Sequence, residues 1–108
     1  MSYWRNSRNY RVWRAKVIRR DKVCQVCGSL QDRHAHHKDD ASTHMGSRFA
    51  VSNGVVLCGS HHRMFHASYK NSYQEPCTEK EYENFIEMIE ALREEFKASA
   101  IKLIKEIR

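Results

Sequence analysis

The stretch Leu57–His66, LCGSHHRMFH, carries one cysteine and three histidines within ten residues. Two shorter runs of the same kind precede it, CQVCG at Cys24–Gly28 and HAHHKDD at His34–Asp40. Cysteine thiolates and histidine imidazoles are common ligands of transition metals in proteins. The pattern therefore predicts a small fold organised by bound metal. The number of metal sites depends on how these cysteines and histidines are grouped as ligands.

Four of these residues fit one structural zinc site. Structural zinc takes four tetrahedral Cys or His ligands, usually donated as two pairs with short internal spacing. Cys24-x-x-Cys27 supplies the first pair and Cys58-x-x-His61 the second. Residues 28–57 separate the two pairs, which is longer than in a simple zinc finger, so we expect further structure inside this loop.

The cysteines favour metal binding over disulfides. The chain has 108 residues, which suits one small domain whose limited core a metal would supplement. It has no apolar run of membrane-spanning length and no signal-peptide core, so we expect a soluble cytoplasmic protein in which a CxxC pair binds zinc. The remaining Cys77 is either an ordinary small residue or replaces His61 as the fourth zinc ligand.

A second group of chemically active residues remains after the zinc ligands are set aside. His62 and His66 are four residues apart, so on a helix they share a face and form a two-point chelate. His36 and His37 are neighbours on an expected strand and point apart, so one can bind metal while the other transfers protons. Asn53 lies between the two groups. The other histidines are expected to be ordinary polar residues: His34 and His44.

The charge of the chain is unevenly distributed. Residues 1–70 contain 13 Lys or Arg and 4 Asp or Glu, giving +9, whereas residues 71–108 contain 6 and 9, giving −3. The first 20 residues hold seven basic side chains and no acidic one. This asymmetry favours a polyanionic partner, most simply nucleic acid, and a merely solvated basic face is the alternative.

The local patterns predict an α+β fold. Apolar spacing over Tyr10–Asp21 indicates a short basic amphipathic helix, and a second helix is expected over Ser60–Ala67. Short strands are expected over Arg33–Lys38 and Arg48–Val51. The dipeptide Asn53-Gly54 predicts a turn. Loops are expected between these elements, including residues 39–47 and 68–77.

The C-terminal third predicts one long helix. Thr78 and Glu81 fit a capping box at its start, and the helix should run to about Ile107. Its apolar seam alternates steps of three and four and is broken at Ser99; its members are Tyr82, Phe85, Ile89, Leu92, Phe96 and Leu103. We expect residues 1–77 to form the core and 78–108 the helix, within one domain. The second half of the helix either extends from this domain or forms a coiled-coil homodimer contact.

Taken together, RRDKVCQVCG, HAHHKDD and VSNGVVLCGSHHRMFH resemble the HNH endonucleases of the ββα-metal superfamily, most closely the small free-standing HNH nucleases of phages. The resemblance covers roughly Trp13 to Phe85. It implies two short strands and a helix around one catalytic metal, with a four-ligand zinc that braces this unit.

The resemblance also assigns roles. His37 matches the general base that activates water, and Asn53 matches the residue that fixes the loop and orients that base. His62 matches a ligand of the catalytic metal. His36 matches a ligand position that is often Asp, and His66 an additional histidine of colicin-type members.

The zinc ligands follow the family less closely. Cys24, Cys27 and Cys58 match it, whereas His61 stands where a cysteine is usual. Histidine also binds zinc, so the resemblance still implies a structural Zn²⁺. The catalytic divalent cation is expected to be Mn²⁺, Ni²⁺, Mg²⁺ or Zn²⁺, and imidazole ligands favour Mn²⁺ or Ni²⁺ over Mg²⁺.

The implied function is a metal-dependent endonuclease that cuts double-stranded DNA in the bacterial host cytoplasm and leaves 5′-phosphate and 3′-hydroxyl ends. Nicking and double-strand cleavage both remain open. The alternative is a non-catalytic zinc module that binds nucleic acid or a protein partner. The expected DNA-backbone contacts are basic side chains: Arg5, Arg8, Arg11, Arg14, Lys16, Arg19, Arg20, Arg48 and Arg63.

Overall fold

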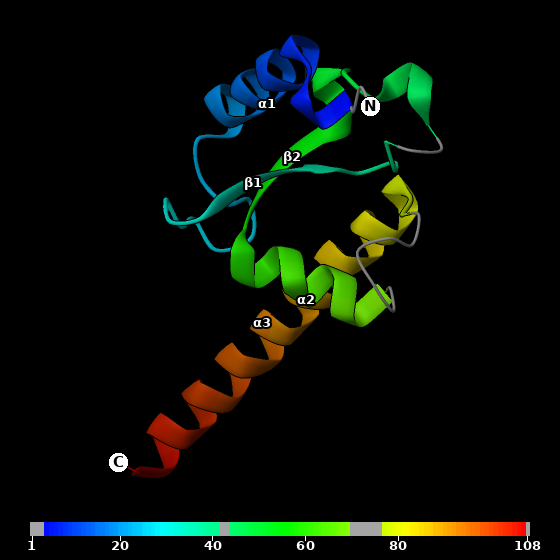
Figure 1. Ribbon diagram of the computed structural model, residues 1–108. Coiled ribbons are helices and arrows are strands. Elements are labelled where there is room, and N and C mark those ends of the chain that lie inside the picture. Colours follow the sequence, from blue (N-terminus) through cyan, green and yellow to red (C-terminus); the bar gives the residue numbers. More distant parts are fainter. Residues whose placement is uncertain (1–3, 42–43, 70–76, 108) are drawn as a thin grey trace.

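The computed structural model describes residues 4–41, 44–69 and 77–107. It combines helices with a two-stranded antiparallel sheet, so the predicted mixed class is confirmed at this level. The sheet lies between α1 on one face and α2 with the start of α3 on the other (Figure 1). The main elements are α1 (Arg8–Asp21), β1 (Arg33–His37), β2 (Gly54–Cys58), α2 (Gly59–Tyr69) and α3 (Glu79–Ile107), with single 3-10 turns at Trp4–Asn6, Met45–Ser47 and Val51–Asn53.

Helix α1 begins two residues before the expected Tyr10. The Ser7 hydroxyl caps its start by accepting a hydrogen bond from the Tyr10 amide at 3.1 Å. Trp13 and Val17, four residues apart, are its buried residues and face the sheet. The arginines of the helix lie on its exposed side, so α1 presents a basic surface while its apolar stripe covers β2.

The strand pairing determines which side chains face which helix layer. The register runs from Arg33 opposite Cys58 to His37 opposite Gly54. Successive residues of β2 point to opposite faces, so Val56 packs with α1 while Val55 and Leu57 pack toward α2 and α3. Because both faces are covered, all five residues of β2 are buried.

The second predicted strand, Arg48–Val51, is wrong. In the structure this segment leads through a turn into a 3-10 turn, and the strand that pairs with β1 begins only at Gly54. Its carbonyl groups bind side chains of α1 instead of a strand: Trp13 Nε1 donates to Ala50 O at 2.9 Å. These tertiary contacts satisfy the backbone in an irregular path, which a residue pattern alone does not reveal.

Gly54 is not the left-handed turn residue that Asn53-Gly54 predicts. Its φ is −103°, which is extended backbone. A Cβ atom at Gly54 would lie 2.4 Å from Val17 Cγ2 and 2.8 Å from Trp13 Cζ2. Glycine is therefore needed here because α1 packs directly against the first residue of β2.

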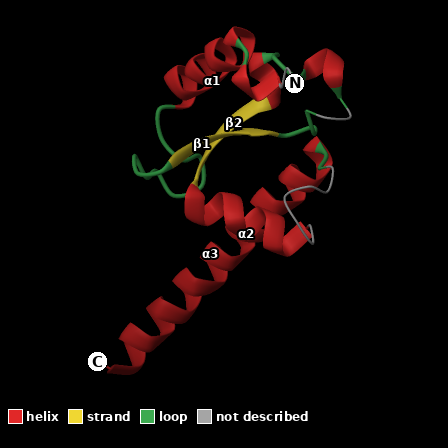
Figure 2. Ribbon diagram, viewed as in Figure 1, coloured by secondary structure: helices red, strands yellow, loops and turns green. Residues whose placement is uncertain are grey.

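Helix α3 has two different halves (Figure 2). The Thr78 hydroxyl accepts from the Glu81 amide at 3.2 Å, and the Glu81 carboxylate accepts from the Thr78 amide at 3.2 Å, so the predicted capping box is present. Phe85 and Ile89 are buried against the body of the protein. From residue 90 onward nearly every side chain is exposed, and the helix extends beyond the body, which gives the molecule its 64 Å long axis.

The predicted loop over residues 68–77 lies mostly outside the described residues, as do positions 42–43 of the loop over 39–47. Among the described helices, none combines the length and apolarity that crossing a membrane would require.

We expect Gly54→Ala to destabilise the fold by about 1–3 kcal/mol, because the added methyl group overpacks the contact with Val17 and Trp13. The measurement is the urea unfolding midpoint at fixed zinc concentration. Gly46→Ala is the matched control, since a Cβ there meets nothing within 4 Å. Equal midpoints for the two variants would refute the packing role of Gly54.

Candidate metal centres

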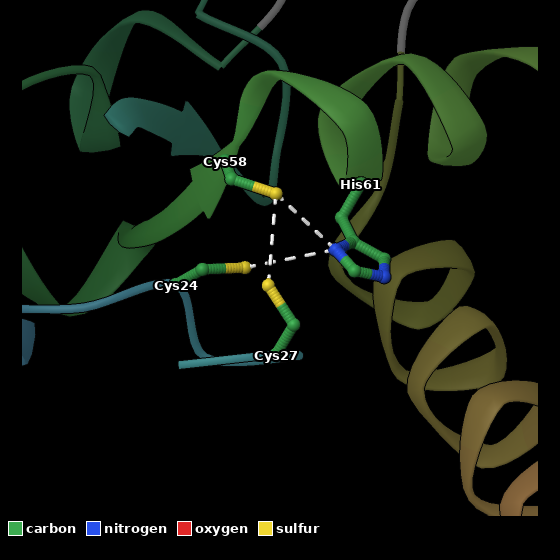
Figure 3. Close-up of side chains that lie close together, drawn as sticks. All are labelled: Cys24, Cys27, Cys58 and His61. Atoms are coloured by element: carbon green, nitrogen blue, oxygen red, sulfur yellow. Dashed lines mark hydrogen bonds between the residues drawn. The ribbon is translucent and has the colours of Figure 1, made fainter. Parts of the chain in front are cut away.

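Three cysteines and one histidine converge at one end of the sheet (Figure 3). Cys24 and Cys27 come from the loop after α1, Cys58 ends β2, and His61 lies in the first turn of α2. The distances are 3.8 Å from Cys27 Sγ to Cys58 Sγ, 3.3 Å from Cys58 Sγ to His61 Nδ1 and 3.9 Å from Cys24 Sγ to His61 Nδ1.

These distances fit a single tetrahedral ion. With zinc bonds of about 2.3 Å to sulfur and 2.1 Å to nitrogen, two sulfurs lie about 3.8 Å apart and a sulfur and a nitrogen about 3.6 Å apart. The observed separations scatter around these values. The four residues can therefore hold a metal such as zinc, and Cys24, Cys27, Cys58 and His61 are the ligands predicted from the spacing.

The surroundings of this Cys/His cluster favour the metal-binding protonation state at Cys24 and His61, whereas burial raises the pKa of the Cys27 thiol. Burial raises the pKa of the Cys24 thiol, but backbone N–H groups of Cys58, Cys27 and Val26 outweigh it, so the net pKa is lowered. Burial, assisted by the positive charge of Arg93, lowers the pKa of His61. A thiolate and a neutral imidazole are the forms that bind metal.

Cys77 is not part of the cluster. Its thiol is buried and donates to the backbone carbonyl of His37 at 3.3 Å. The structure therefore places His61, and not Cys77, in the fourth ligand position.

A second cluster consists of His36, His62 and His66, whose ligand atoms all lie within 4.8 Å of one another. His62 and His66 lie one turn apart on α2, and their Nε2 atoms are 3.2 Å apart. His36 reaches them from β1, with its ring centroid 5.2 Å from that of His62. The spacing predicted the α2 pair, and the fold brings the third histidine to it.

These three imidazoles are suited to bind a cation. Burial lowers the pKa of His36 well below its ordinary value, assisted by the neighbouring His62 and His66. Burial also lowers the pKa of His62 to about 4. The His36 Nε2 atom is buried and has no hydrogen-bond partner within the described part of the chain. A buried nitrogen with an unused lone pair, beside two further imidazoles, is what a metal ligand needs.

The neighbours His61 and His62 serve different clusters. Successive residues of a helix differ in direction by about 100°. His61 therefore faces the cysteines while His62 faces His36 and His66, and the first turn of α2 joins the two centres.

His37 lies on the opposite face of β1 from His36. Its ring stacks on Trp13 at a centroid distance of 4.0 Å and an interplanar angle of 9°. Its Nε2 atom is 2.9 Å from the carbonyl oxygen of Arg48. Because a carbonyl can only accept, this Nε2 carries the hydrogen, and in the neutral ring Nδ1 has the free lone pair. Burial lowers the pKa of His37, so the neutral form prevails at pH 7.

Asn53 fixes the backbone around His37. Its Oδ1 accepts from the Asp39 amide at 2.8 Å, and its Nδ2 donates to the Asp39 carbonyl at 2.9 Å. The same Nδ2 reaches the carbonyl of Ser47 at 3.5 Å. The buried amide thus ties the end of β1 to the residue before Arg48, whose carbonyl orients the His37 ring.

One pocket of about 410 Å³ connects these residues. His36, His37, His62 and His66 all line it, although the first two lie on opposite faces of a strand. Arg5 and Arg14 line the same pocket. His34 also lines it, with its Nε2 atom 2.9 Å from Asp32 Oδ1, so it is closer to the site than the sequence suggests.

The nine predicted DNA contacts are in different environments. Arg8, Lys16 and Arg19 are exposed on α1, and Arg63 is exposed on α2. Arg20 is tied to the fold although its side chain is 42 % exposed: its guanidinium pairs with Asp21 at 2.7 Å and donates to the carbonyls of Val51 and Gly54. This arrangement assigns Arg20 a structural role.

Further predicted contacts also make internal interactions, among them Arg14, which donates to the carbonyl of Arg33 at 3.4 Å. Arg11 donates to the carbonyl of Asn6 at 2.8 Å. Arg48 donates to the carbonyl of Ala41 and covers the Trp4 ring at 4.9 Å.

Sequence reasoning missed three supporting residues. Trp4 packs edge-on against His37 with ring centroids 5.5 Å apart. Asp21 accepts from the backbone amide of Val56 at 2.9 Å. Arg93 of α3 donates to the carbonyl of Val26 in the loop of the Cys/His cluster. These contacts join segments that are distant in the sequence and leave no local signal in it.

Comparison with family models, with curated proteins and with solved structures found no match to this chain.

We expect Cys27→Ala to remove one tightly bound zinc per chain, since it deletes one of four ligands at an exposed position. Cys77→Ala should retain this zinc, because Cys77 lies outside the cluster. The measurement is metal content by mass spectrometry after dialysis against a weak chelator. Loss of zinc from both variants, or from neither, would contradict the assignment.

Proposed function

We propose that this protein is a metal-dependent DNA endonuclease of the HNH type. The observation that carries the proposal is the convergence, in one pocket, of the cluster His36–His62–His66 and a separately oriented His37. A metal-binding cluster alone would fit a structural role. A neutral imidazole with a free Nδ1 beside that cluster adds a base, and the two arginines of the pocket fit a phosphate substrate.

His37 is the proposed general base. Its Nδ1 atom would take a proton from a water molecule, which then attacks the phosphorus of the scissile phosphodiester. The Arg48 carbonyl and the Trp13 ring hold the imidazole in one tautomer and one orientation. Asn53 is a positioning residue, since it acts through the backbone on either side of this contact.

The three-histidine cluster is the proposed catalytic metal site. His36, His62 and His66 would hold a divalent cation, which would supply Lewis-acid stabilisation of the negative charge that develops on the scissile phosphate. His36, His62 and His66 would provide neutral nitrogen ligands on one side of the ion. The side of the ion that faces the pocket would stay open to a substrate. Nitrogen ligands favour Mn²⁺ or Ni²⁺ over Mg²⁺, which prefers oxygen.

The Cys/His cluster has a bracing role in this proposal. It would bind zinc and fix the junction of β2 and α2, because Cys58 and His61 lie on either side of that junction. His62 follows His61 directly, so the position of the catalytic cluster depends on this junction. A ββα unit braced by zinc is the architecture that the HNH resemblance implies.

The proposed DNA contacts surround the pocket. Arg5 and Arg14 line it, and Arg8, Lys16 and Arg19 extend the basic surface along α1. Such side chains bind phosphates and hold the duplex in place without reading its sequence. The pocket would then receive one phosphodiester at a time.

We expect His37→Ala to reduce plasmid cleavage about 10²- to 10⁴-fold, because the proton-accepting group is lost. The measurement is conversion of supercoiled plasmid to nicked or linear DNA with Mn²⁺, Ni²⁺, Mg²⁺ or EDTA. Cleavage should be faster in Mn²⁺ or Ni²⁺ than in Mg²⁺ and absent in EDTA. His44→Ala, an exposed histidine outside the pocket, is the control and should cut normally.

Two results of this assay would exclude catalysis. Cleavage by His37→Ala at the wild-type rate would remove the base from the mechanism. Failure of every metal to support cleavage by the zinc-loaded protein would favour the non-catalytic zinc module.

We expect DNA affinity to fall steeply with salt, because each neutralised phosphate releases counterions. Arg14→Ala should lower the slope of log K against log salt by about one, whereas Arg20→Ala should leave the slope unchanged. Fluorescence anisotropy with a labelled duplex measures both. A salt-independent affinity would contradict a binding mode based on α1.

A further inference from the structure

We propose that the free half of α3, residues 90–107, pairs antiparallel with the same segment of a second copy of this chain. The first observation is continuity. Phe85 and Ile89 are buried against the body, and the same apolar seam continues through Leu92, Phe96 and Leu103 at steps of three, four and seven. These three side chains are 53 %, 75 % and 57 % exposed. An apolar seam prolonged beyond the core that it covers is suited to a helical partner.

The charges of this segment are self-complementary in one orientation only. Residues 90–96 contain three Glu and one Arg, a net charge of −2. Residues 97–107 contain three Lys and one Glu, a net charge of +2. Two parallel copies would place like charges side by side, whereas two antiparallel copies place each acidic half beside a basic half. A second copy of the segment therefore provides the complementary charges.

The seam residues fit the same orientation. With the two-fold axis between Lys97 and Ala98, Leu92 lies opposite Leu103 of the second copy, and Phe96 lies opposite Ser99. A large side chain then meets a small one, which fills the layer evenly. A parallel pair would instead place Phe96 against Phe96 and Ser99 against Ser99. The break in the seam at Ser99, which weakens a parallel coiled coil, thus becomes the space for an aromatic ring.

Flanking side chains add a specific contact. Glu95 and Lys102 are seven residues apart, so they flank the seam on the same side. In the antiparallel pair these flanks face each other, so Glu95 of each copy lies beside Lys102 of the other. The two-fold symmetry therefore produces two such ion pairs. In the described part of the chain, neither residue has an ion pair with its own helix, whereas Lys97 pairs with Glu94 at 3.4 Å.

The length of the free segment matches this geometry. With about 1.5 Å per residue, residues 92–107 span about 24 Å. In the antiparallel pair Ile107 comes level with Met88 of the second copy, where the body of that copy begins to cover α3. Two helices of this length bury on the order of 1,000 Å², which is at the low end for a specific interface, so the dimer should be of micromolar affinity.

The test is sedimentation velocity of the zinc-loaded full chain over a concentration series. We expect the mass to rise from 12.8 kDa toward twice that value. Phe96→Glu should weaken association more than about hundredfold, since it places a charge in the centre of the seam. Ile101→Glu is the matched control: Ile101 is 54 % exposed but lies about 140° around the helix from Phe96, so association should not change.

Charge exchange tests the orientation. Glu95→Lys and Lys102→Glu should each weaken association roughly tenfold, and the double variant E95K/K102E should restore it. Circular dichroism verifies that each variant keeps its helices. A monomer at every concentration would overturn the proposal, as would a dimer that survives Phe96→Glu. Failure of the double variant to restore association would overturn the antiparallel arrangement. The mass does not depend on cleavage, so this inference and the proposed activity can fail separately.

Discussion

The candidate site depends on the register in which β1 pairs with β2. This register directs His36 toward α2 and His37 toward α1, so the proposed cation ligand and the proposed base approach one pocket from opposite faces of the same strand. A slip by one residue would exchange these faces and place His37 beside the α2 histidines. The pairing is secured because both faces of β2 are buried, with Val56 under α1 and Leu57 toward α2. The packing of the two hydrophobic cores on either side of β2 thus determines which face of the sheet His36 and His37 each lie on.

The junction of β2 and α2 transmits this constraint to the helix. Cys58 ends the strand and His61 lies one turn into the helix, so a metal bound by both would fix the direction in which α2 leaves the sheet. His62 and His66 then face His36. Helix α3 supports the same region, since Arg93 donates to the carbonyl of Val26 beside the cysteine pair. In a domain with such small cores, ligation and side-chain contacts to the backbone supplement apolar burial.

The sequence indicated much of the site because metal ligands obey local spacing rules. Cys24-x-x-Cys27 and Cys58-x-x-His61 each fit a turn that can present two ligands, and the His62–His66 pair follows from helix periodicity. The irregular segments were less predictable. A short strand was expected over Arg48–Val51, yet the carbonyls of Ala50 and Val51 accept from side chains of α1, Trp13 and Arg20. Gly54 suggested a turn, whereas in the fold the absence of a Cβ atom at Gly54 leaves room for Val17 and Trp13.

The sequence by itself determined the helices, the capping box of α3, the division of the histidines and cysteines into two groups, and the basic N-terminal surface. These features depend on periodicity, spacing and charge, which are local properties of the chain. Only the tertiary structure decided that His61 and not Cys77 completes the cysteine cluster, that the Arg20 guanidinium donates to backbone carbonyls of the fold, and that the Arg48 carbonyl orients His37. The physical reason is that these outcomes depend on contacts between segments far apart in sequence, whose geometry is fixed by packing on both faces of one short sheet.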